Sequence, residues 1–563
     1  MATHSGKPSY TTPWDTTPFS FIPLTIVDLR ARQQARVIRS SSVDNGTPLL
    51  SISTAKPVES PSCGTHNVGM TSEHCTPIVM TEAGPVQGRI NDGVATYLGL
   101  PYAAPPTRFE LPVRLARWTE VRDATVRGPT APHKVRPFPN LDVVPLVGTG
   151  SDGSDGDYLR LNIWAPENAQ GAPVMVWVHG GGFVVGSKDA PISDGTEFAR
   201  SGVVCVAINY RMGIDGFLPV PGAPTNLGLR DMLFALGWVR DNIAAFGGDP
   251  ENVTAFGESA GAMAIANLVT SPLAKGLFKR AIIQSGHGAM VRDILVAQRL
   301  VRKLARRLGV SPDAEGFRSV SHVSAMAALE KVAKPASIDL RDGDGFEPVF
   351  GISRFIPVWG DDVLPLKPIE ALRQGAGAEI EIMIGTNAEE MNLYFVPTAV
   401  RDKIPGPLAW WLLSRSLPNA RRALKAYGWG QKGVRPGVAM TRAMSDLVFR
   451  WPARQYASAH RGRTHMYEME WRSPACSGEL GACHGIELPF VFKTLDIATG
   501  PAGLVGEAPP GELADRIHSI WVNFATDGTV PWRHWNGDRL VYQLAAGDTI
   551  VEPPMAAAHF LPD

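Results

Sequence analysis

Residues 253–262 read VTAFGESAGA, an apolar run that turns at a serine with a glycine two positions away on each side. An Asp-Pro turn signal at 249–250 precedes the run, and the small apolar residues after it suit a helix. A strand–turn–helix context in which Gly257 and Gly261 let the two elements approach closely is typical of a nucleophile elbow. The pattern predicts that a strained turn holds Ser259 out where a substrate can reach it.

The composition is that of a large globular protein, with 563 residues of which 44% are hydrophobic and 19% charged. The chain is long enough for one large core or for two or three ordinary domains. Its 54 basic and 54 acidic residues balance, which leaves no net field to steer it toward nucleic acid or an anionic membrane. No apolar run approaches the length of a bilayer span. A small or neutral partner is expected.

Residues 1–76 are rich in Ser, Thr and Pro and lack sustained periodicity, which predicts a disordered or loosely ordered tail before a catalytic domain at 77–563. The five cysteines are an odd number spread over a long chain. They do not make a disulfide framework, so a reducing, cytoplasmic location is favoured. Cys476 and Cys483 could pair, but free thiols are the favoured interpretation.

Strand and helix signals alternate through the folded part. Short alternating segments between Ile78 and Gly99 predict an antiparallel start. Apolar runs without alternation indicate strands buried on both faces of a sheet; they occupy residues 173–178, 203–210, 281–285 and 380–385. The signals predict an α/β fold with a mostly parallel central sheet and helices on both faces.

Two helix-rich stretches, about 292–334 and 400–459, are too long for simple crossovers between strands. Insertions on such a sheet tend to lie over the carboxyl ends of the strands, where ligands bind. We expect them to form a gorge or a cap within one catalytic unit. A separate helical subdomain is the alternative.

A serine hydroxyl is a weak nucleophile, so it needs a base, an acid that orients the base, and donors for the oxyanion. The triglycine 180–182 follows an apolar strand and exposes backbone N–H groups without side chains in the way. Together with the N–H of Ala260, it supplies candidate oxyanion donors for attack by Ser259.

At this point the chain resembles the type B carboxylesterases of the α/β-hydrolase fold, which include cholinesterases and bacterial p-nitrobenzyl esterases. The resemblance runs from about Ile78 to Val551. It rests on motifs in the family's order: GLPYAAPP at Gly99, LNIWAP at Leu161, HGGGF at His179, NYRMG at Asn209, FGGDPENVTAFGESAGA at Phe246, QSG at Gln284, GTNAEE at Gly385 and CHGIELPFVF at Cys483.

The resemblance implies a triad. Its acid falls on Glu390, five residues after Gly385, and its base falls on His484 of the H-G-x-E segment. The order serine, acid, histidine is the one expected of this fold. Glu389 is the alternative acid if the register shifts by one residue.

The resemblance also implies supporting roles around the triad. The oxyanion donors are Gly181, Gly182 and Ala260. Glu258 and Ser285 match positions beside the triad, although a purely structural hydrogen bond is the alternative for Ser285. His179 is expected to order its loop, and Arg211 and Asp231 match a structural ion pair.

Candidates for an apolar acyl or alcohol pocket are Phe183, Met391, Trp471, Trp410 and Trp411. Met391 stands where the family commonly has glycine, so it should intrude on the pocket or shift the local turn. The segment at 157–159 lacks the cysteine of secreted members, which supports a reducing location. The aromatic choline site of cholinesterases lies on that missing loop, so choline esters are not expected as preferred substrates.

The predicted reaction is two-step acyl transfer through an acyl-enzyme on small to medium apolar or aryl esters, with no metal or cofactor. An amidase or carbamate hydrolase with the same triad is the alternative. A non-catalytic binding module on this fold is a third possibility, against which the intact Ser259, Glu390 and His484 argue. The resemblance and the cysteine usage favour the cytoplasm of a bacterium.

Overall fold

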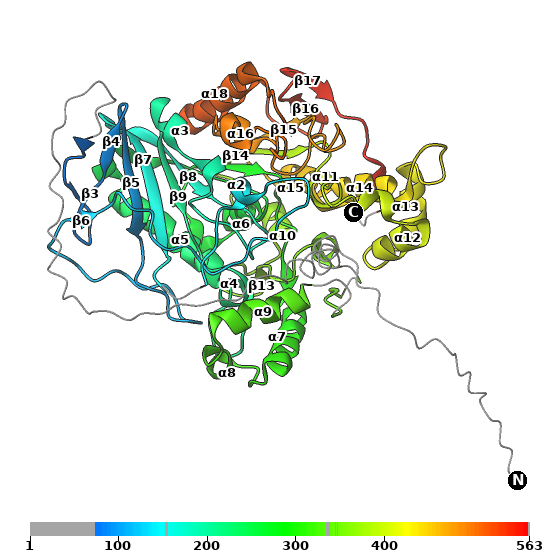
Figure 1. Ribbon diagram of the computed structural model, residues 1–563, viewed down its shortest axis with the longest axis horizontal. Coiled ribbons are helices and arrows are strands. Elements are labelled where there is room, and N and C mark those ends of the chain that lie inside the picture. The colour runs from blue at the N-terminus through cyan, green and yellow to red at the C-terminus, as the bar shows by residue number, and fades with distance from the viewer. Residues whose placement is uncertain (1–73, 153–155, 334–337, 344, 346, 561–563) are drawn as a thin grey trace, which may run out of the picture.

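The computed structural model describes residues 74–152, 156–333, 338–343, 345 and 347–560 (Figure 1). The tail predicted for residues 1–76 therefore lies mostly outside the described residues. The described chain begins in strand β1 (His74–Cys75), which pairs with β4 (Arg89–Asn91). The folded part thus reaches back into the stretch predicted as tail.

A 12-stranded sheet runs through the protein in the order β1-β4-β5-β7-β9-β8-β10-β11-β14-β15-β16-β17. Its parallel centre consists of β9 (Val204–Ile208), β8 (Ala172–Val178), β10 (Gly248–Glu258), β11 (Arg280–Gln284), β14 (Glu381–Asn387), β15 (Thr464–Met469) and β16 (Leu540–Gln543). Antiparallel strands flank this centre: β5 (Val94–Pro101), β7 (Arg160–Pro166) and β17 (Asp548–Val551). The predicted mostly parallel sheet is confirmed.

Smaller sheets form at the periphery. One joins β2 (Val79–Met80), β3 (Pro85–Gln87) and β6 (Arg122–Asp123), and another pairs β12 (Arg292–Asp293) with β13 (Val358–Trp359). Short helices lie in the connections: α2 (Val144–Val147), α4 (Gly213–Phe217), α11 (Asn392–Phe395) and α17 (Leu495–Ala498).

Helices cover both faces of the sheet (Figure 1). One face holds α5 (Leu227–Asn242), α6 (Ala260–Val269), α10 (Pro368–Arg373) and α15 (Trp451–Ala459). The other holds α3 (Thr196–Arg200), α16 (Leu488–Val491) and α18 (Gly511–Asp527). In β10, Val253 and Ala255 join the first core, whereas Phe256 joins the second. The side chains of a strand alternate between faces, so a strand buried on both sides is apolar along its length.

The two predicted insertions are helical. The first contains α7 (Ile294–Leu308), α8 (Ala314–Arg318) and α9 (His322–Val332). The second contains α12 (Gly406–Ser414), α13 (Ala420–Ala426), α14 (Pro436–Ser445) and the π-helical turn η6 (Asp446–Arg450), which leads into α15. Figure 1 shows them extending from different sides of the sheet. Among the described residues, no helix combines the length and apolar character needed to cross a bilayer.

A buried ion pair joins the segment after β9 to helix α5. Arg211 donates from Nη2 to Asp231 Oδ1 at 2.6 Å and from Nε to Oδ2 at 2.8 Å. The backbone N–H of Arg211 donates to the same carboxylate at 2.9 Å. The side chains are 1% and 0% exposed, so this bidentate pair, expected from the sequence, locks the turn onto α5.

We expect Asp231→Asn to lower the free energy of unfolding by about 3–5 kcal/mol, because it leaves the Arg211 guanidinium buried without its counter-charge. The matched control is Asp362→Asn. Asp362 pairs with Arg230 and its side chain is 64% exposed, so its loss should cost less than about 1 kcal/mol. Urea unfolding of both variants measures the difference, and equal losses would contradict a locking role for the buried pair.

Candidate active site

Ser259 lies on a sharp turn between β10 and α6. Its backbone has φ 55° and ψ −123°, a region that residues other than glycine rarely occupy. A Cβ on Gly261 would lie 2.0 Å from the carbonyl oxygen of Val178, and one on Gly257 would lie 2.6 Å from the same atom. Side chains at these two positions would therefore push β8, β10 and α6 apart, and the turn has the geometry expected of a nucleophile elbow.

The glycine run 180–182 follows β8 beside this turn, where a Cβ on Gly180 would lie 3.1 Å from Ser259 Cβ. Gly181 and Gly182 have φ 99° and 63°. Neither backbone N–H donates a hydrogen bond within the described part of the chain. The N–H of Ala260 is the first of helix α6, where no intrahelical acceptor is available. The three predicted oxyanion donors are thus gathered around the serine with their N–H groups unused.

The carboxylate of Glu390 holds the imidazole of His484. His484 Nδ1 lies 2.7 Å from Glu390 Oε2. The other carboxylate oxygen, Oε1, accepts from Ser285 Oγ at 2.7 Å and from the N–H of Asn387 at 2.8 Å. Glu390 is fully buried, so these donors compensate the cost of burying its charge and fix its orientation.

The neighbouring Glu389 faces away from the imidazole. Its carboxylate pairs with Arg472 and accepts from the N–H of Ala482 at 3.0 Å. Its side chain is 30% exposed. Of the two candidate acids, Glu390 is therefore the one that contacts His484.

The second nitrogen of His484 faces Glu258 and the mouth of the elbow. His484 Nε2 lies 3.0 Å from Glu258 Oε1, but the two atoms are not aligned for a hydrogen bond. Glu258, Ser259 and His484 all line one cavity. Within the described residues no hydrogen bond joins Ser259 Oγ to Nε2. Catalytic hydrogen bonds are often loose without substrate and tighten when it binds.

Burial controls the protonation of this cluster. It raises the pKa of Glu258 to about 8, against the attraction of His484 and with support from the negative charge of Glu487. Burial by itself would lower the pKa of His484, but the carboxylates of Glu258 and Glu390 raise it to about 9. Glu258 and His484 are therefore coupled. A protonated Glu258 has no negative charge to stabilise the imidazolium. The imidazole of His484 is then more readily unprotonated and available as a base.

Two aromatic residues that the sequence analysis did not identify pack against the imidazole. The ring centroids of Phe449 and Tyr394 lie 4.5 Å and 5.6 Å from that of His484. The Tyr394 hydroxyl also interacts with the side chain of Ser259, and burial raises the pKa of the phenol, which therefore stays protonated. Tyr394 follows Glu390 by four residues. This helical spacing, which places two side chains on one side of a helix, is the sequence signal that could have identified Tyr394 as a neighbour of the triad.

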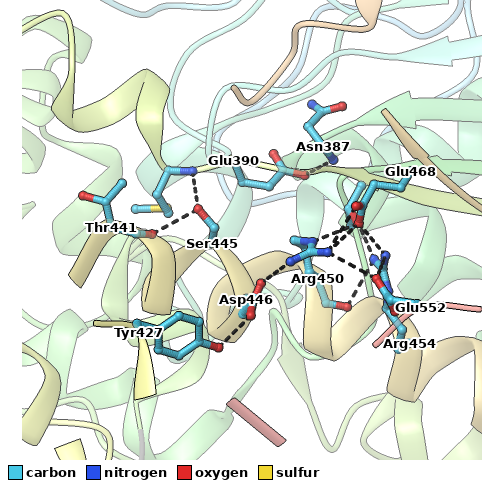
Figure 2. Close-up of polar contacts among 12 residues, drawn as sticks. Asn387, Glu390, Tyr427, Thr441, Ser445, Asp446, Arg450, Arg454, Glu468 and Glu552 are labelled. Carbon is cyan, nitrogen blue, oxygen red and sulfur yellow. Dashed lines mark hydrogen bonds and ion pairs between the residues drawn. The ribbon is translucent and has the colours of Figure 1, made fainter. Parts of the chain in front are cut away.

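Phe449 belongs to η6, and a buried ion network anchors this turn (Figure 2). The network joins two guanidinium groups to three carboxylates with nitrogen–oxygen distances of 2.5–3.2 Å, and comprises Arg450, Arg454, Asp446, Glu468 and Glu552. Glu468 belongs to β15, and Arg454 also donates to Thr386 of β14. The network thus fixes η6 to two central strands and keeps Phe449 against His484. Such π-helical turns are frequent at functional sites.

Met391 is held from the same helical insertion. Its N–H donates to Ser445 Oγ at 3.0 Å, and the Ser445 hydroxyl donates to the carbonyl of Thr441 at 3.0 Å (Figure 2). Met391 has an ordinary φ of −75° and lines the cavity. Of the two outcomes expected for a side chain in place of glycine, the structure shows intrusion on the pocket.

The cavity over Ser259 has a volume of about 390 Å³ and is lined largely by apolar side chains. Both insertions contribute to its wall: α9 supplies Met326 and Leu329, and α12 supplies Leu408 and Leu412. The helical insertions therefore form a gorge over the carboxyl ends of the strands, as predicted.

The other predicted pocket residues lie outside this wall. Phe183 is buried against Phe217, with ring centroids 4.4 Å apart, and Trp471 packs against a ring of α16. Trp410 and Trp411 are 46% and 42% exposed. All four were predicted as pocket residues because they are aromatic. In the structure, the rings of Phe183 and Trp471 pack against neighbouring rings of the protein, and those of Trp410 and Trp411 face outward.

Two smaller predictions concern side chains near the site. His179 Nδ1 donates to the carbonyl of Gly180 at 3.0 Å, its ring stacks on Tyr210, and burial lowers its pKa to about 3. It is a neutral residue that orders the glycine loop. Cys476 and Cys483 are free thiols, which was the favoured alternative.

Comparison with known proteins agrees with this geometry. The profile of the carboxylesterase family matches residues 75–537. The chain belongs to the carboxylesterase family. Its fold is the α/β-hydrolase fold and its activity class is carboxylic-ester hydrolysis, as the sequence motifs predict.

Relatives of this carboxylesterase cover most of its length. Para-nitrobenzyl esterase of Bacillus subtilis (strain 168) is 36% identical over 465 residues, which are 80% of this chain and 90% of the relative. Phenmedipham hydrolase of Pseudarthrobacter oxydans is 35% identical over 469 residues, with the same coverage of 80% and 90%. Among solved structures, a carboxylesterase of Geobacillus stearothermophilus has a TM-score of 0.69 at 33% identity, covering 83% of this chain and 96% of the other.

Proposed function

We propose that this carboxylesterase hydrolyses small to medium apolar or aryl esters through an acyl-enzyme on Ser259. The observation that carries the proposal is the convergence of Ser259, His484 and Glu390 at one apolar cavity, with His484 Nδ1 2.7 Å from the buried carboxylate. Unused backbone N–H groups beside the serine complete the arrangement that acyl transfer requires.

In the proposed mechanism, Ser259 Oγ attacks the ester carbonyl while His484 Nε2 takes its proton. Glu390 keeps Nδ1 protonated and offsets the charge of the imidazolium. The imidazolium then protonates the leaving alcohol, and water repeats both steps on the acyl-enzyme. The N–H groups of Gly181 and Gly182, with that of Ala260, stabilise the oxyanion; one such donor typically contributes about a hundredfold or more to turnover.

Three further side chains assist this mechanism as positioning residues. Ser285 donates to Glu390 and fixes the acid. The hydroxyl of Tyr394 interacts with the side chain of Ser259 and helps to hold Oγ in place. A protonated Glu258 adds no charge beside Nε2 and leaves His484 free to accept that proton.

The substrate class is proposed from the cavity wall. Six of the 16 methionines line it, namely Met212, Met263, Met290, Met326, Met391 and Met444. Methionine is unbranched and flexible, so such a wall adapts to acyl and aryl groups of different shapes. The similarity to para-nitrobenzyl esterase supports aryl esters.

Carbamate hydrolysis is the second candidate, because phenmedipham hydrolase is 35% identical to this chain. It would use the same residues on a less reactive carbonyl. Measurement of kcat/KM on an aryl ester and a carbamate of the same phenol ranks the two. We also propose a cytoplasmic location in a bacterium, on the free thiols of Cys205, Cys476 and Cys483 and on the bacterial relatives.

Ser259→Ala should abolish hydrolysis of p-nitrophenyl butyrate, because no other group on the turn can form the acyl-enzyme. An organophosphonate should add one equivalent to the native chain, with the label on Ser259, as mass spectrometry of peptides would show. Turnover near the native rate by a folded Ser259→Ala protein would refute the proposed nucleophile.

Glu390→Gln should lower kcat by about 10⁴-fold, because an amide beside His484 Nδ1 no longer selects the productive tautomer. Glu389→Gln is the matched control, one residue earlier and facing Arg472, and it should keep kcat within a few-fold of the native value. Steady-state kinetics on both variants test the assignment. A larger loss for Glu389→Gln would transfer the role of the acid to that residue.

The pH dependence of kcat/KM should follow the coupled pair of Glu258 and His484. Activity needs an unprotonated Nε2, so kcat/KM rises as the pair loses its proton. Above about pH 8 Glu258 is ionised, and its charge favours the imidazolium. Glu258→Gln removes this ionised form, which lowers the pKa of His484 and should move the rising limb to lower pH by about one unit. Glu389→Gln should leave the limb in place. An alkaline shift or an unchanged limb in Glu258→Gln would contradict the coupling.

A further inference from the structure

Helix α12 is apolar on every side although it stands at the surface. Its sequence GPLAWWLLS contains no charged residue. The protein covers two of its sides, one along the cavity and one in the core, through Leu408, Leu412, Ala409 and Leu413. The remaining side exposes Trp410 and Trp411, at 46% and 42%. A helix that is apolar all round is normally buried in protein or in lipid. The exposure of Trp410 and Trp411 therefore indicates that a binding partner covers them.

The chain around α12 is strongly basic. Residues 403–445 contain no Asp or Glu but eight lysines and arginines, which are Lys403, Arg415, Arg421, Arg422, Lys425, Lys432, Arg435 and Arg442. All of these except the half-buried Arg415 are exposed. Within the described residues, only Arg435 of this set forms an ion pair, with Asp402. The remaining charges are available to an anionic partner.

The aromatic and basic groups belong to one projecting unit. Helix α12 packs against α13, which exposes Arg421, Arg422 and Lys425. The guanidinium of Arg415 lies 5.5 Å from the ring centroid of Trp411. In Figure 1 this pair of helices stands out from the body of the protein at one edge. The same α12 forms part of the wall of the cavity over Ser259.

We propose that α12 and α13 form a docking surface for an anionic phospholipid membrane. Tryptophan favours the headgroup level of a bilayer, where its ring is buried and its N–H stays polar. Lysine and arginine side chains beside it attract anionic headgroups. The helix would lie in the interface without crossing it. An acidic protein surface without an apolar patch of its own would pair with the charges and leave Trp410 and Trp411 exposed to water, whereas an anionic membrane supplies both the charge and the apolar phase.

Membrane docking would place the cavity wall next to the lipid surface. Apolar esters concentrate in membranes, and Leu408 and Leu412 of the same helix line the cavity over Ser259. The docking surface therefore adds a route by which lipid-dissolved esters reach the site. Docking itself requires no catalysis, so it is independent of the proposed hydrolytic function.

Helix α7 supplies an internal comparison. It exposes Arg302, Lys303, Arg306 and Arg307 but no tryptophan. Binding driven by charge alone would use α7 as readily as α13. A requirement for α12 would show that the tryptophans enter the lipid.

Co-sedimentation of the full chain with vesicles tests the proposal. The native protein should bind vesicles rich in phosphatidylglycerol, bind pure phosphatidylcholine far less, and dissociate as salt is raised. A double variant, Trp410→Ala with Trp411→Ala, should bind about tenfold more weakly while its turnover of soluble p-nitrophenyl butyrate stays native, which also shows that it is folded. Arg421→Glu with Arg422→Glu should weaken binding similarly. The matched control, Arg306→Glu with Arg307→Glu, should bind like the native protein.

Several results would overturn this inference. Equal losses in the α7 and α13 charge variants, or native binding by the tryptophan variant, would reduce the contact to general charge attraction. Retention on heparin without binding to phosphatidylglycerol vesicles would make the partner a polyanionic macromolecule in place of a membrane. Lost docking with intact turnover refutes only the docking surface, whereas an active Ser259→Ala protein refutes only the proposed nucleophile.

Discussion

The close approach of β8, β10 and α6 is the constraint on which the site depends. It exists because the chain has no side chain at Gly257 and Gly261, where a Cβ would lie 2.6 Å and 2.0 Å from the carbonyl oxygen of Val178. The same approach holds Ser259 at a positive φ, at the head of α6. Strain of this kind persists only where the surroundings over-determine it, and here two central strands and a buried helix do so. The nucleophile, the N–H of Ala260 and the glycine loop after β8 all take their positions from this one contact.

A second constraint is electrostatic. Three buried carboxylates, on Glu258, Glu390 and Glu487, surround one imidazole in different environments. Glu390 receives donors from Ser285 and Asn387 and binds His484, so its charge is well solvated by the protein. Glu258 Oε1 has no hydrogen-bond partner within the described residues, and burial raises its pKa. One acid is thus hydrogen-bonded on both oxygens and orients the base, whereas the other, beside the serine, lacks a partner at Oε1 and has a raised pKa.

The sequence predicted several of the central strands but not β15. Strands β8, β9, β10, β11 and β14 were expected because an unbroken apolar run has few uses other than a strand buried on both faces. Strand β15 is just as buried but carries His465 and Glu468, whose polarity conceals it. Glu468 is tolerated there because Arg450 of η6 and Arg454 of α15, which precede it by 18 and 14 residues, reach its carboxylate. Pairing of that kind has no local signal.

The site shows the same division. Motif spacing led to Ser259, Glu390 and His484, whereas aromatic identity misplaced Phe183 and Trp471. Phe449 could not be anticipated, because it reaches His484 from a π-helical turn that breaks the 3.6-residue period on which helix prediction relies. Total charge carries no information about individual surfaces. A net charge of zero describes the field far from the protein. At ordinary ionic strength, counter-ions screen the field of a surface charge beyond about 8–10 Å. A surface therefore responds to the charges within that distance, and the stretch 403–445 that contains α12 carries only positive ones.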